Sequence, residues 1–466
     1  MKGFVVLLLV LSASSALYSG VMMQGFFWNY DSGGVWWAKM QSQASALRNM
    51  AGTGIGINRM WFPPACKGQA GSFSMGYDPH DYYDLGSYDQ DGSIPTRAGT
   101  QAQLKAAIAA FKAQGISCMA DIVLNHRAGG NSEANPKTGG FTWTAFNNTA
   151  SGKCQWHWDS FHPNNYCSGD EGTFGGYPDI CYASGSASGD MKAYLVWLKS
   201  SANAGFDSWR YDYCKGFGAS VVHDMNAASS PAFSVGEYWD TNTAALDNWA
   251  VAANSSCFDF ALLYTMEAVC NHPGGGHLPD LLDPAKCYAA RNPKRAVTFV
   301  GNHDTDPITA DKMLAYAFIL TYQGYPCIFW NDYFNAGFAN GGGNGSGWGN
   351  GIKQLVWCRE KLAAGAPVIQ VLQGSNSDCI IYGSSGSSAA APGYIVVINA
   401  SPSSWKSYTV VTGNGYLKGK TLKAYAWSSS VSGQNFAPSS PVCDSNGGVL
   451  VSAPPRGYAV YSASGF

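Results

Sequence analysis

Eight short apolar runs recur between residues 21 and 330, and the segments between them carry helical patterns. The runs lie at residues 21–28, 57–64, 118–126, 206–212, 233–239, 257–264, 296–304 and 325–330. The helical segments 100–115, 190–205 and 308–324 each end on the glycine that is typical just past a helix C-terminus. Eight repeats of strand and helix are the pattern of a (β/α)8 TIM barrel, whose active sites lie at the C-terminal ends of the strands. An α/β fold built on such a barrel is therefore predicted.

Two parts of the chain depart from this pattern. Residues 127–189, after the third strand, are rich in Gly, Asn, Trp and Cys and show no helical period. A connection of that length indicates a subdomain or a functional loop. After residue 365 the composition changes to Ser, Gly, Val and Tyr in short alternating runs, which predicts a C-terminal β-sandwich over 366–466. The barrel is then expected to comprise residues 17–126 and 190–365.

The N-terminus resembles an export signal. Met1 to Ala16 contain one Lys, the apolar run FVVLLLVL and a group of small residues, which is typical of a secretory signal peptide. The apolar run is too short to span a bilayer, and no later stretch reaches the necessary length. We therefore expect a secreted protein with no membrane partner, whose mature chain begins near Leu17. Export favours disulfides among the 13 Cys, which include no CxxC pair.

Composition narrows the choice of partner. Only 12% of the residues are charged and the net charge is −2, with no run of Lys or Arg. Nucleic-acid binding needs clustered cations, so such a partner is not expected. The 16 Trp and 26 Tyr suit stacking against neutral hydroxylated rings, although core packing uses the same residues. A monomer that acts on an uncharged substrate is expected.

Acidic and basic residues gather at the predicted C-terminal ends of four strands. They are Asn125, His126, Arg210, Asp212, Glu237, His303 and Asp304. A single acid at such a position is more often a helix cap or a solvated loop residue. Three carboxylates, two His and one Arg directed at one mouth are harder to explain in that way. Paired carboxylates with a third acid nearby suit glycoside hydrolysis.

These segments resemble the four motif regions of the α-amylase family of glycoside hydrolases. The segments are DIVLNH (121–126), GFDSWRYDYCKG (205–216), VGEY (235–238) and FVGNHD (299–304), in the family's order. Three further segments are similar to archaeal and plant-type α-amylases. They are SMGYDPHDYYDLG (74–86), NHRAGG (125–130) and DEGTFGGYPDIC (170–181). The resemblance extends from about Met22 to Phe329 and implies a barrel, an inserted calcium-binding subdomain at 127–189 and a C-terminal sandwich.

The resemblance also implies catalytic roles. Asp212 matches the nucleophile, Glu237 the general acid/base, and Asp304 the third acid, which holds sugar hydroxyls and helps to keep Glu237 protonated. The local charges agree with these roles, because Arg210 stabilises the ionised form of Asp212 and neighbouring carboxylates raise the pKa of Glu237.

Four further residues match substrate-binding positions of the family. His126 and His303 are similar to the pair that hydrogen-bonds the sugar at the cleavage point. Tyr77 matches the stacking platform, and Lys215 resembles a substrate-binding Lys beyond the cleavage point. Taken singly, a His or Tyr at such a position is ordinarily structural.

A calcium site is implied by the same resemblance. Asn125, Asp170 and Asp179 match its side-chain ligands, and Gly172 and Gly216 match its backbone carbonyl ligands. Oxygen donors are what calcium requires. By themselves the three side chains also fit an Asx turn and two surface acids. Because Asn125 ends the third strand and Gly216 follows the fourth, an ion here would hold the insertion to the barrel.

A zinc site is the alternative to a disulfide at His162, Cys167 and Cys181. Similar archaeal enzymes bind zinc through two His and one Cys at matching places, whereas Cys167 replaces one His here. In an oxidising compartment Cys167 and Cys181 form a disulfide instead. We favour the disulfide and leave zinc as the alternative.

The expected function is that of a secreted, retaining, endo-acting α-amylase that hydrolyses internal α-1,4-glucosidic bonds of starch or glycogen. The first alternative is an α-glucan transglycosylase of the same family, which usually carries further C-terminal domains. The second is a non-catalytic carbohydrate-binding protein on the same scaffold, which typically lacks one of the acids. All three acids are present in this chain.

Overall fold

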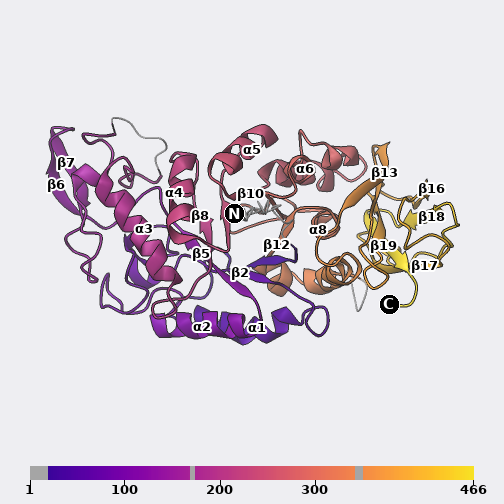
Figure 1. The fold of residues 1–466 in the computed structure, drawn as a ribbon, viewed down its shortest axis with the longest axis horizontal. Coiled ribbons are helices and arrows are strands. Elements are labelled where there is room, and N and C mark those ends of the chain that lie inside the picture. Colours follow the sequence, from indigo (N-terminus) through magenta and orange to yellow (C-terminus); the bar gives the residue numbers. More distant parts are fainter. Residues whose placement is uncertain (1–18, 168–173, 342–349) are drawn as a thin grey trace, which may run out of the picture.

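A closed barrel of eight parallel strands forms the centre of the molecule (Figure 1). The computed structural model describes residues 19–167, 174–341 and 350–466. The barrel strands are β1 (Met22–Gln24), β2 (Arg59–Trp61), β5 (Ser117–Ile122), β8 (Ser208–Tyr211), β9 (Phe233–Gly236), β10 (Ser256–Phe258), β11 (Ala296–Phe299) and β12 (Tyr325–Phe329). Each lies within one of the eight predicted apolar runs or overlaps it by all but one residue. The predicted TIM barrel is therefore confirmed.

Helices surround the barrel, as the helical patterns predict. They are α1 (Trp36–Arg48), α2 (Gln101–Ala113), α3 (Gly185–Lys199), α4 (Ala219–Ser229), α5 (Thr243–Ala252), α6 (Phe260–Cys270), α7 (Tyr288–Arg291), α8 (Lys312–Thr321) and α9 (Ile352–Trp357). Helix α2 begins with a capping box in which Thr100 and Gln103 each bond the other's backbone N–H. Its apolar stripe, including Leu104, Ile108 and Phe111, is buried, because apolar positions three and four apart share one face of a helix.

One predicted helix is displaced along the chain. The pattern predicts a helix over 190–205, but α3 starts earlier and ends at Lys199. The backbone N–H groups of Gly205 and Phe206 both bond to the carbonyl oxygen of Leu198, at 3.0 and 3.2 Å. This turn takes the place of the last predicted helical residues and leads the chain into β8.

The insertion after β5 is a small unit with its own hairpin. Strands β6 (Asn131–Asn135) and β7 (Gly140–Ala145) pair antiparallel and lie at one end of the molecule in Figure 1. Arg127, which is fully buried, joins this unit to the barrel side. It donates hydrogen bonds to the carbonyl oxygens of His80 and Cys154, and its guanidinium lies 3.9 Å from the ring centre of Phe146. A second short ladder, β3 (Lys67–Gly68) with β4 (Pro79–Asp81), precedes the insertion.

The C-terminal part consists of two antiparallel sheets, as expected for a β-sandwich. The first contains β13 (Ile369–Asn376), β14 (Cys379–Ser384), β15 (Tyr394–Asn399), β19 (Gly457–Ala463) and β17 (Leu422–Ser429), and the second β16 (Lys406–Val411) and β18 (Gly448–Ala453). Ile380 and Tyr382 of β14 belong to the core shared with the barrel, whereas Cys379 and Ile381 belong to the core between the two sheets. The period of two therefore lets one strand serve both cores.

Within the described part of the chain, no helix has both the length and the apolar character needed to cross a bilayer. The predicted signal peptide, Met1 to Ala16, lies outside the described residues. The domain boundaries given above stay predictions.

Candidate active site

Arg210 on β8 is the centre of a buried cluster at the carboxyl ends of the barrel strands. Its Nη1 donates hydrogen bonds to Asp121 at 2.8 Å and to Asp212 at 2.6 Å, and its Nη2 lies 2.9 Å from Oε1 of Glu237. The three carboxylates come from β5 and from the residues just past β8 and β9. Three neighbouring parallel strands therefore bring three acids to one guanidinium, of which Asp212 and Glu237 are among the acids predicted at the strand ends.

Glu237 has the environment of a general acid. Its side chain is buried, and its Oε2 accepts a hydrogen bond from the backbone N–H of Tyr213 at 2.9 Å. Burial raises the pKa of Glu237 to about 8, and the negative charges of Asp212 and Asp304 act in the same direction, while Arg210 opposes them. At neutral pH the carboxyl is therefore mainly protonated and has a proton to donate.

Asp304 and His303 lie on the other side of the mouth, in the loop after β11. Nε2 of His303 lies 3.0 Å from Oδ2 of Asp304, and its Nδ1 lies 2.9 Å from Nε2 of Gln24. Because the Gln24 amide nitrogen is a donor, Nδ1 accepts and Nε2 donates to Asp304. Burial and the charge of Arg210 hold the pKa of His303 well below its usual value, so the ring is neutral. Burial and the charge of Asp212 raise the pKa of Asp304 to about 6.

A stacked aromatic wall adjoins these acids. The rings of Tyr77 and His303 lie 5.1 Å apart at an angle of 12°, and the ring of Trp28 stacks beside both, at 6.1 and 6.3 Å. Tyr77 is buried and its hydroxyl donates to Asp121 at 2.8 Å. Trp28 is 48% exposed, so it presents the accessible ring surface of the wall.

Sequence analysis did not select Asp121 or Trp28 as site residues. Asp121 accepts hydrogen bonds from Trp61, Tyr77 and Arg210, so it fixes the ring and guanidinium positions of the site. The sequence did contain a signal that could have identified each as a site residue, because Asp121 is the first residue of the motif segment 121–126 and Trp28 is the last of the first apolar run. Both strands were recognised, but which of their residues face the mouth depends on barrel geometry.

His126 and Lys215 occupy different surroundings. His126 is fully buried, and its Nε2 lies 2.8 Å from the carbonyl oxygen of Tyr77. Phe174 stacks on its ring at 4.6 Å. Lys215 lies at the rim and pairs with Asp240 at 2.9 Å. Substrate contacts of these two residues stay predictions.

Three of the five predicted calcium ligands come together beside the mouth. Asn125 Nδ2 donates to Asp179 Oδ1 at 2.8 Å. The backbone of Gly216 passes so close to Asn125 that a Cβ at this position would lie 1.8 Å from Asn125 Oδ1. The side chains of Asn125 and Asp179 and the backbone of Gly216 therefore lie together, and amide, carboxylate and backbone carbonyl oxygens are the donor types that calcium takes. The other predicted ligands, Asp170 and Gly172, lie outside the described residues.

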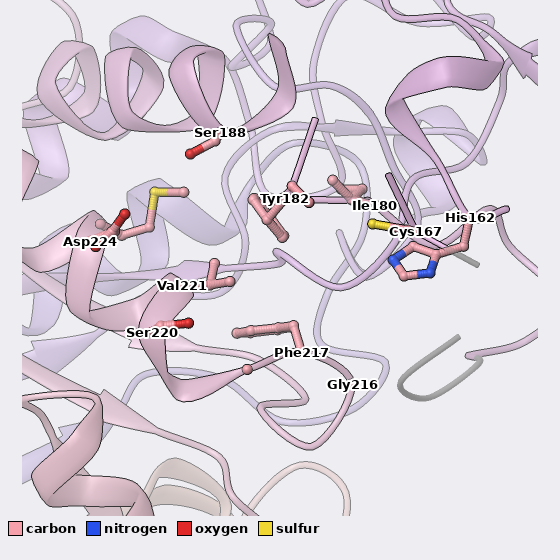
Figure 2. A pocket seen from close by; sticks show the side chains of 13 residues that line it. His162, Cys167, Ile180, Tyr182, Ser188, Gly216, Phe217, Ser220, Val221 and Asp224 are labelled. Carbon is pink, nitrogen blue, oxygen red and sulfur yellow. The ribbon is translucent and has the colours of Figure 1, made fainter. Parts of the chain in front are cut away.

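A cavity of about 320 Å³ continues from this position between the insertion and α4. Gly216 and Phe217 line it on the barrel side, and Ile180 and Tyr182 on the insertion side (Figure 2). The hydroxyl of Tyr182 donates to the carbonyl oxygen of Leu124 at 2.7 Å. The end of the insertion is therefore attached to the end of β5 on this side.

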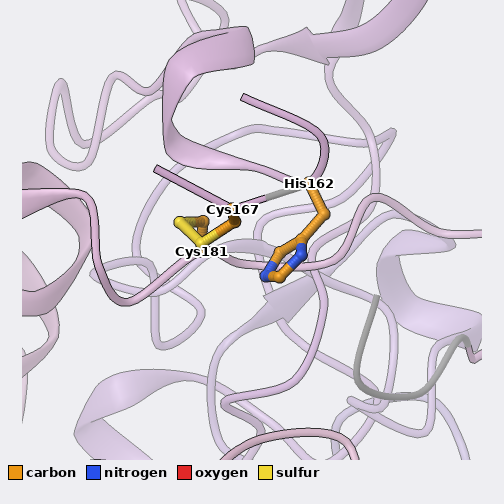
Figure 3. Close-up of side chains that lie close together, drawn as sticks. All are labelled: His162, Cys167 and Cys181. Carbon is orange, nitrogen blue, oxygen red and sulfur yellow. A yellow bond between two sulfur atoms is a disulfide. The ribbon is translucent and has the colours of Figure 1, made fainter. Parts of the chain in front are cut away.

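Cys167 and Cys181 form a disulfide, with His162 beside it (Figure 3). One ligand atom from each of the three residues lies within 4.8 Å of the others. Zinc needs thiolates, and sulfurs that are bonded to each other are not thiolates, so the zinc set does not fit this state. The prediction of a disulfide is confirmed in the structure. The remaining cysteines are buried thiols.

Comparisons with known proteins agree with this geometry, although no family model matches the chain. The chain is 31% identical over 377 residues to the glucan 1,4-α-maltohexaosidase of Bacillus sp. (strain 707), covering 68% of this chain and 71% of the relative. It is also 31% identical over 381 residues to the α-amylase of Geobacillus stearothermophilus, covering 69% and 68%.

A solved structure shares the fold. The crystal structure of an α-amylase from Geobacillus thermoleovorans, complexed with acarbose, superposes with a TM-score of 0.67 at 15% identity, covering 95% of this chain and 97% of that one. With the sequence relatives and the buried acidic cluster, these findings place the chain in the α-amylase family of glycoside hydrolases.

Proposed function

We propose that this glycoside hydrolase is a secreted, retaining, endo-acting α-amylase that cleaves internal α-1,4-glucosidic bonds of starch or glycogen by double displacement. The observation that carries the proposal is the pair Asp212 and Glu237 on one guanidinium, with the pKa of Glu237 raised to about 8. One carboxyl is thereby a proton donor and its neighbour is paired with Arg210. That division of roles is what a retaining mechanism needs. The segment 74–86 supports the archaeal and plant-type subgroup.

The two steps use the same two residues. In the first, Asp212 bonds to the anomeric carbon while the glycosidic C–O bond breaks, and Glu237 gives its proton to the leaving glucan oxygen. In the second, ionised Glu237 takes a proton from water, whose oxygen displaces Asp212. The proton balance closes because Glu237 ends the cycle protonated.

Asp304 and His303 would hold the sugar at the cleavage point. Asp304 is the most exposed acid of the site, with 35% of its side chain accessible, and His303 orients it through Nε2. Its charge also helps to keep Glu237 protonated. Trp28 would then stack on the glucan at the entrance, since its ring is accessible beside His303.

Calcium would be held by Asn125, Asp179 and the carbonyl of Gly216, with Asp170 and Gly172 as further predicted ligands. Its chemistry is that of a structural cation, which neutralises the acids and joins the insertion to the barrel. The chain's own residues carry out the reaction.

Secretion is supported by the pattern at residues 1–16 and by the disulfide, which persists in oxidising compartments. Expression with the full N-terminus, followed by N-terminal sequencing of protein recovered from the medium, tests it. A chain that stays inside the cell and begins at Met1 would contradict secretion.

Product analysis on soluble starch tests the activity itself. Short linear maltooligosaccharides, with a rapid fall in polymer size, are expected from wild type and not from Glu237→Gln. Cyclic or lengthened products would identify the transglycosylase instead. Binding without any product would identify the non-catalytic protein.

A further inference from the structure

A large cavity lies at the end of the barrel opposite the acidic cluster. Its volume is about 910 Å³, and residues at or just before the amino ends of four barrel strands line it. Among them are Arg59 at the start of β2, Phe233 at the start of β9, Ser256 at the start of β10, and Arg295 just before β11. A small-molecule site typically measures about 300–1,000 Å³, so this space is large enough for one.

The lining carries positive charge. Arg59, Lys294 and Arg295 line the cavity, and none of its described lining residues is Asp or Glu. Among the described residues, no carboxylate lies within 4.0 Å of the charged nitrogens of these three cations, and Asp247, beside the lining, is 3.9 Å from Arg291 instead. Asn292, also in the lining, donates to Asp247 at 2.7 Å, so that carboxylate is engaged by an amide. Cations gathered without acids are the arrangement that binds phosphate groups.

Arg59 is the strongest element of this arrangement. It is only 8% exposed, and its guanidinium lies 4.3 Å from the ring centre of Phe233. Nη1 donates to the hydroxyl of Tyr325 at 3.1 Å, which is a neutral acceptor, and Nε has no hydrogen-bond partner among the described residues. Burying a cation without an anion is costly, so a charge of opposite sign in the cavity would stabilise this Arg.

Arg295 is held in place on the other side. Its Nη1 donates to the carbonyl oxygens of Ala250 and Ser255, at 3.1 and 2.9 Å. A guanidinium fixed in advance loses little conformational entropy when a ligand binds. Lys294 is exposed and adds a mobile cation at the same cavity. Two fixed guanidiniums and one ammonium therefore share this space.

We propose that this cavity is a second ligand site, which binds a phosphate group either as the free anion or as the ester of a small hydroxylated molecule such as a sugar. The cavity exceeds the size of a bare phosphate, and the hydroxyl and amide groups of Ser230, Ser256 and Asn254 line it beside the cations. Carboxylates, which commonly hold neutral sugars, are not among its described lining residues. The site does not depend on the reaction at the opposite end of the barrel.

Isothermal titration of the full protein at constant calcium tests the proposal, with glucose 1-phosphate, inorganic phosphate and glucose as probes. Glucose 1-phosphate is expected to bind, and glucose is not. The double variant Lys294→Ala/Arg295→Gln should weaken binding at least tenfold. Lys137→Ala, in the exposed turn of the β6–β7 hairpin, is the matched control and should bind like wild type. Starch hydrolysis should be unchanged in both variants.

The outcomes separate the sources and the alternatives. Tighter binding of glucose 1-phosphate than of inorganic phosphate identifies an ester, and the reverse identifies the free anion. Saturation of the active site with maltooligosaccharide should leave the affinities for glucose 1-phosphate and for inorganic phosphate unchanged. The proposal is overturned if neither phosphate binds at millimolar concentration, if the double variant binds like wild type, or if glucose binds equally well. Arg59→Lys keeps the positive charge and should retain most of the affinity for phosphate. It tests Arg59 without the risk of misfolding that removal of a buried charge would bring.

Discussion

At the scale of single residues, Arg210 sets the positions of the acids in the site. It is 0% exposed and bonded to three carboxylates, so the acids of the site are held together by one buried cation. Truncating Asp212 or Glu237 would leave a donor of this buried guanidinium without an acceptor, so the variants should be the isosteric amides, which lose the charge but keep a carbonyl oxygen for Arg210.

Asp212→Asn and Glu237→Gln are each expected to abolish starch hydrolysis while the fold remains intact. The nucleophile and the proton donor do not replace each other, and a positioned acid/base group contributes roughly 10²-fold or more. Reducing-sugar release measures activity, and circular dichroism measures folding. Asp31→Asn, at an exposed acid that pairs with Lys39 and not with Arg210, is the control. More than about a tenth of wild-type activity in a folded Asp212 or Glu237 variant would refute the assignment.

The pH dependence should follow Glu237. Its protonated form is the active acid, so kcat/KM is expected to fall as pH rises through a pKa of about 8. The charge of Asp304 disfavours the ionised form of Glu237 and thus raises its pKa. Asp304→Asn should therefore move the alkaline limb to lower pH, as well as slowing hydrolysis. Profiles on a short soluble maltooligosaccharide measure this, and a limb that stays in place or moves upward contradicts the interaction.

At the scale of elements, two neighbouring strands set the stereochemistry. β8 and β9 pair in parallel with Tyr211 opposite Gly236, and Asp212 and Glu237 are the next residue on each strand. Such neighbours suit the separation of about 5–5.5 Å that retaining enzymes use. Proton NMR early in the reaction should detect the α-anomer first. If the β-anomer appears first, a water rather than Asp212 attacks the sugar.

The attachment of the insertion to β5 should depend on calcium. An ion that binds only the folded state raises its stability, so chelation is expected to lower the melting temperature and activity, and added calcium to restore both. Asp179→Ala should reproduce the effect of chelation. Gly216→Ala should do so too, because its Cβ would lie 1.8 Å from Asn125 Oδ1.

Asp159→Ala is the matched control, at an exposed acid of the same insertion. It should respond to calcium like wild type. A melting temperature that is unchanged after verified calcium removal would eliminate the structural ion.

At the scale of the whole molecule, the chain has one disulfide beside many thiols that the core protects. Unreduced peptide mapping should yield a linked Cys167–Cys181 peptide, and elemental analysis should find no stoichiometric zinc. The other cysteines are buried and should react with alkylating reagents only after unfolding. If zinc is found in stoichiometric amount and both Cys167 and Cys181 can be alkylated after unfolding, the disulfide assignment is wrong and these residues bind zinc.

Local periodicity was enough to predict the barrel, the C-terminal sheets and the gathering of acids at the strand ends, whereas the catalytic roles of those acids came from the family resemblance. Apolar runs of strand length alternate with helical stripes, and residues that follow parallel strands meet at one rim whatever the details of packing. Arg210 and Asp212 are two residues apart, so the period of two of a strand places both side chains on one face. The cause of the raised pKa of Glu237 could be predicted only in part, since burial, its largest cause, depends on packing.

Other features of the site could not be predicted, because they depend on contacts between residues far apart in the chain. Asp121 and Trp28 became part of the site through Tyr77 and His303, which lie on other segments. The turn at Leu198 ended α3 before its pattern did. The cationic cavity is lined by residues from the starts of four strands, and these residues do not form a motif in the sequence. Barrel closure brings them together at one end, and no local pattern encodes that encounter.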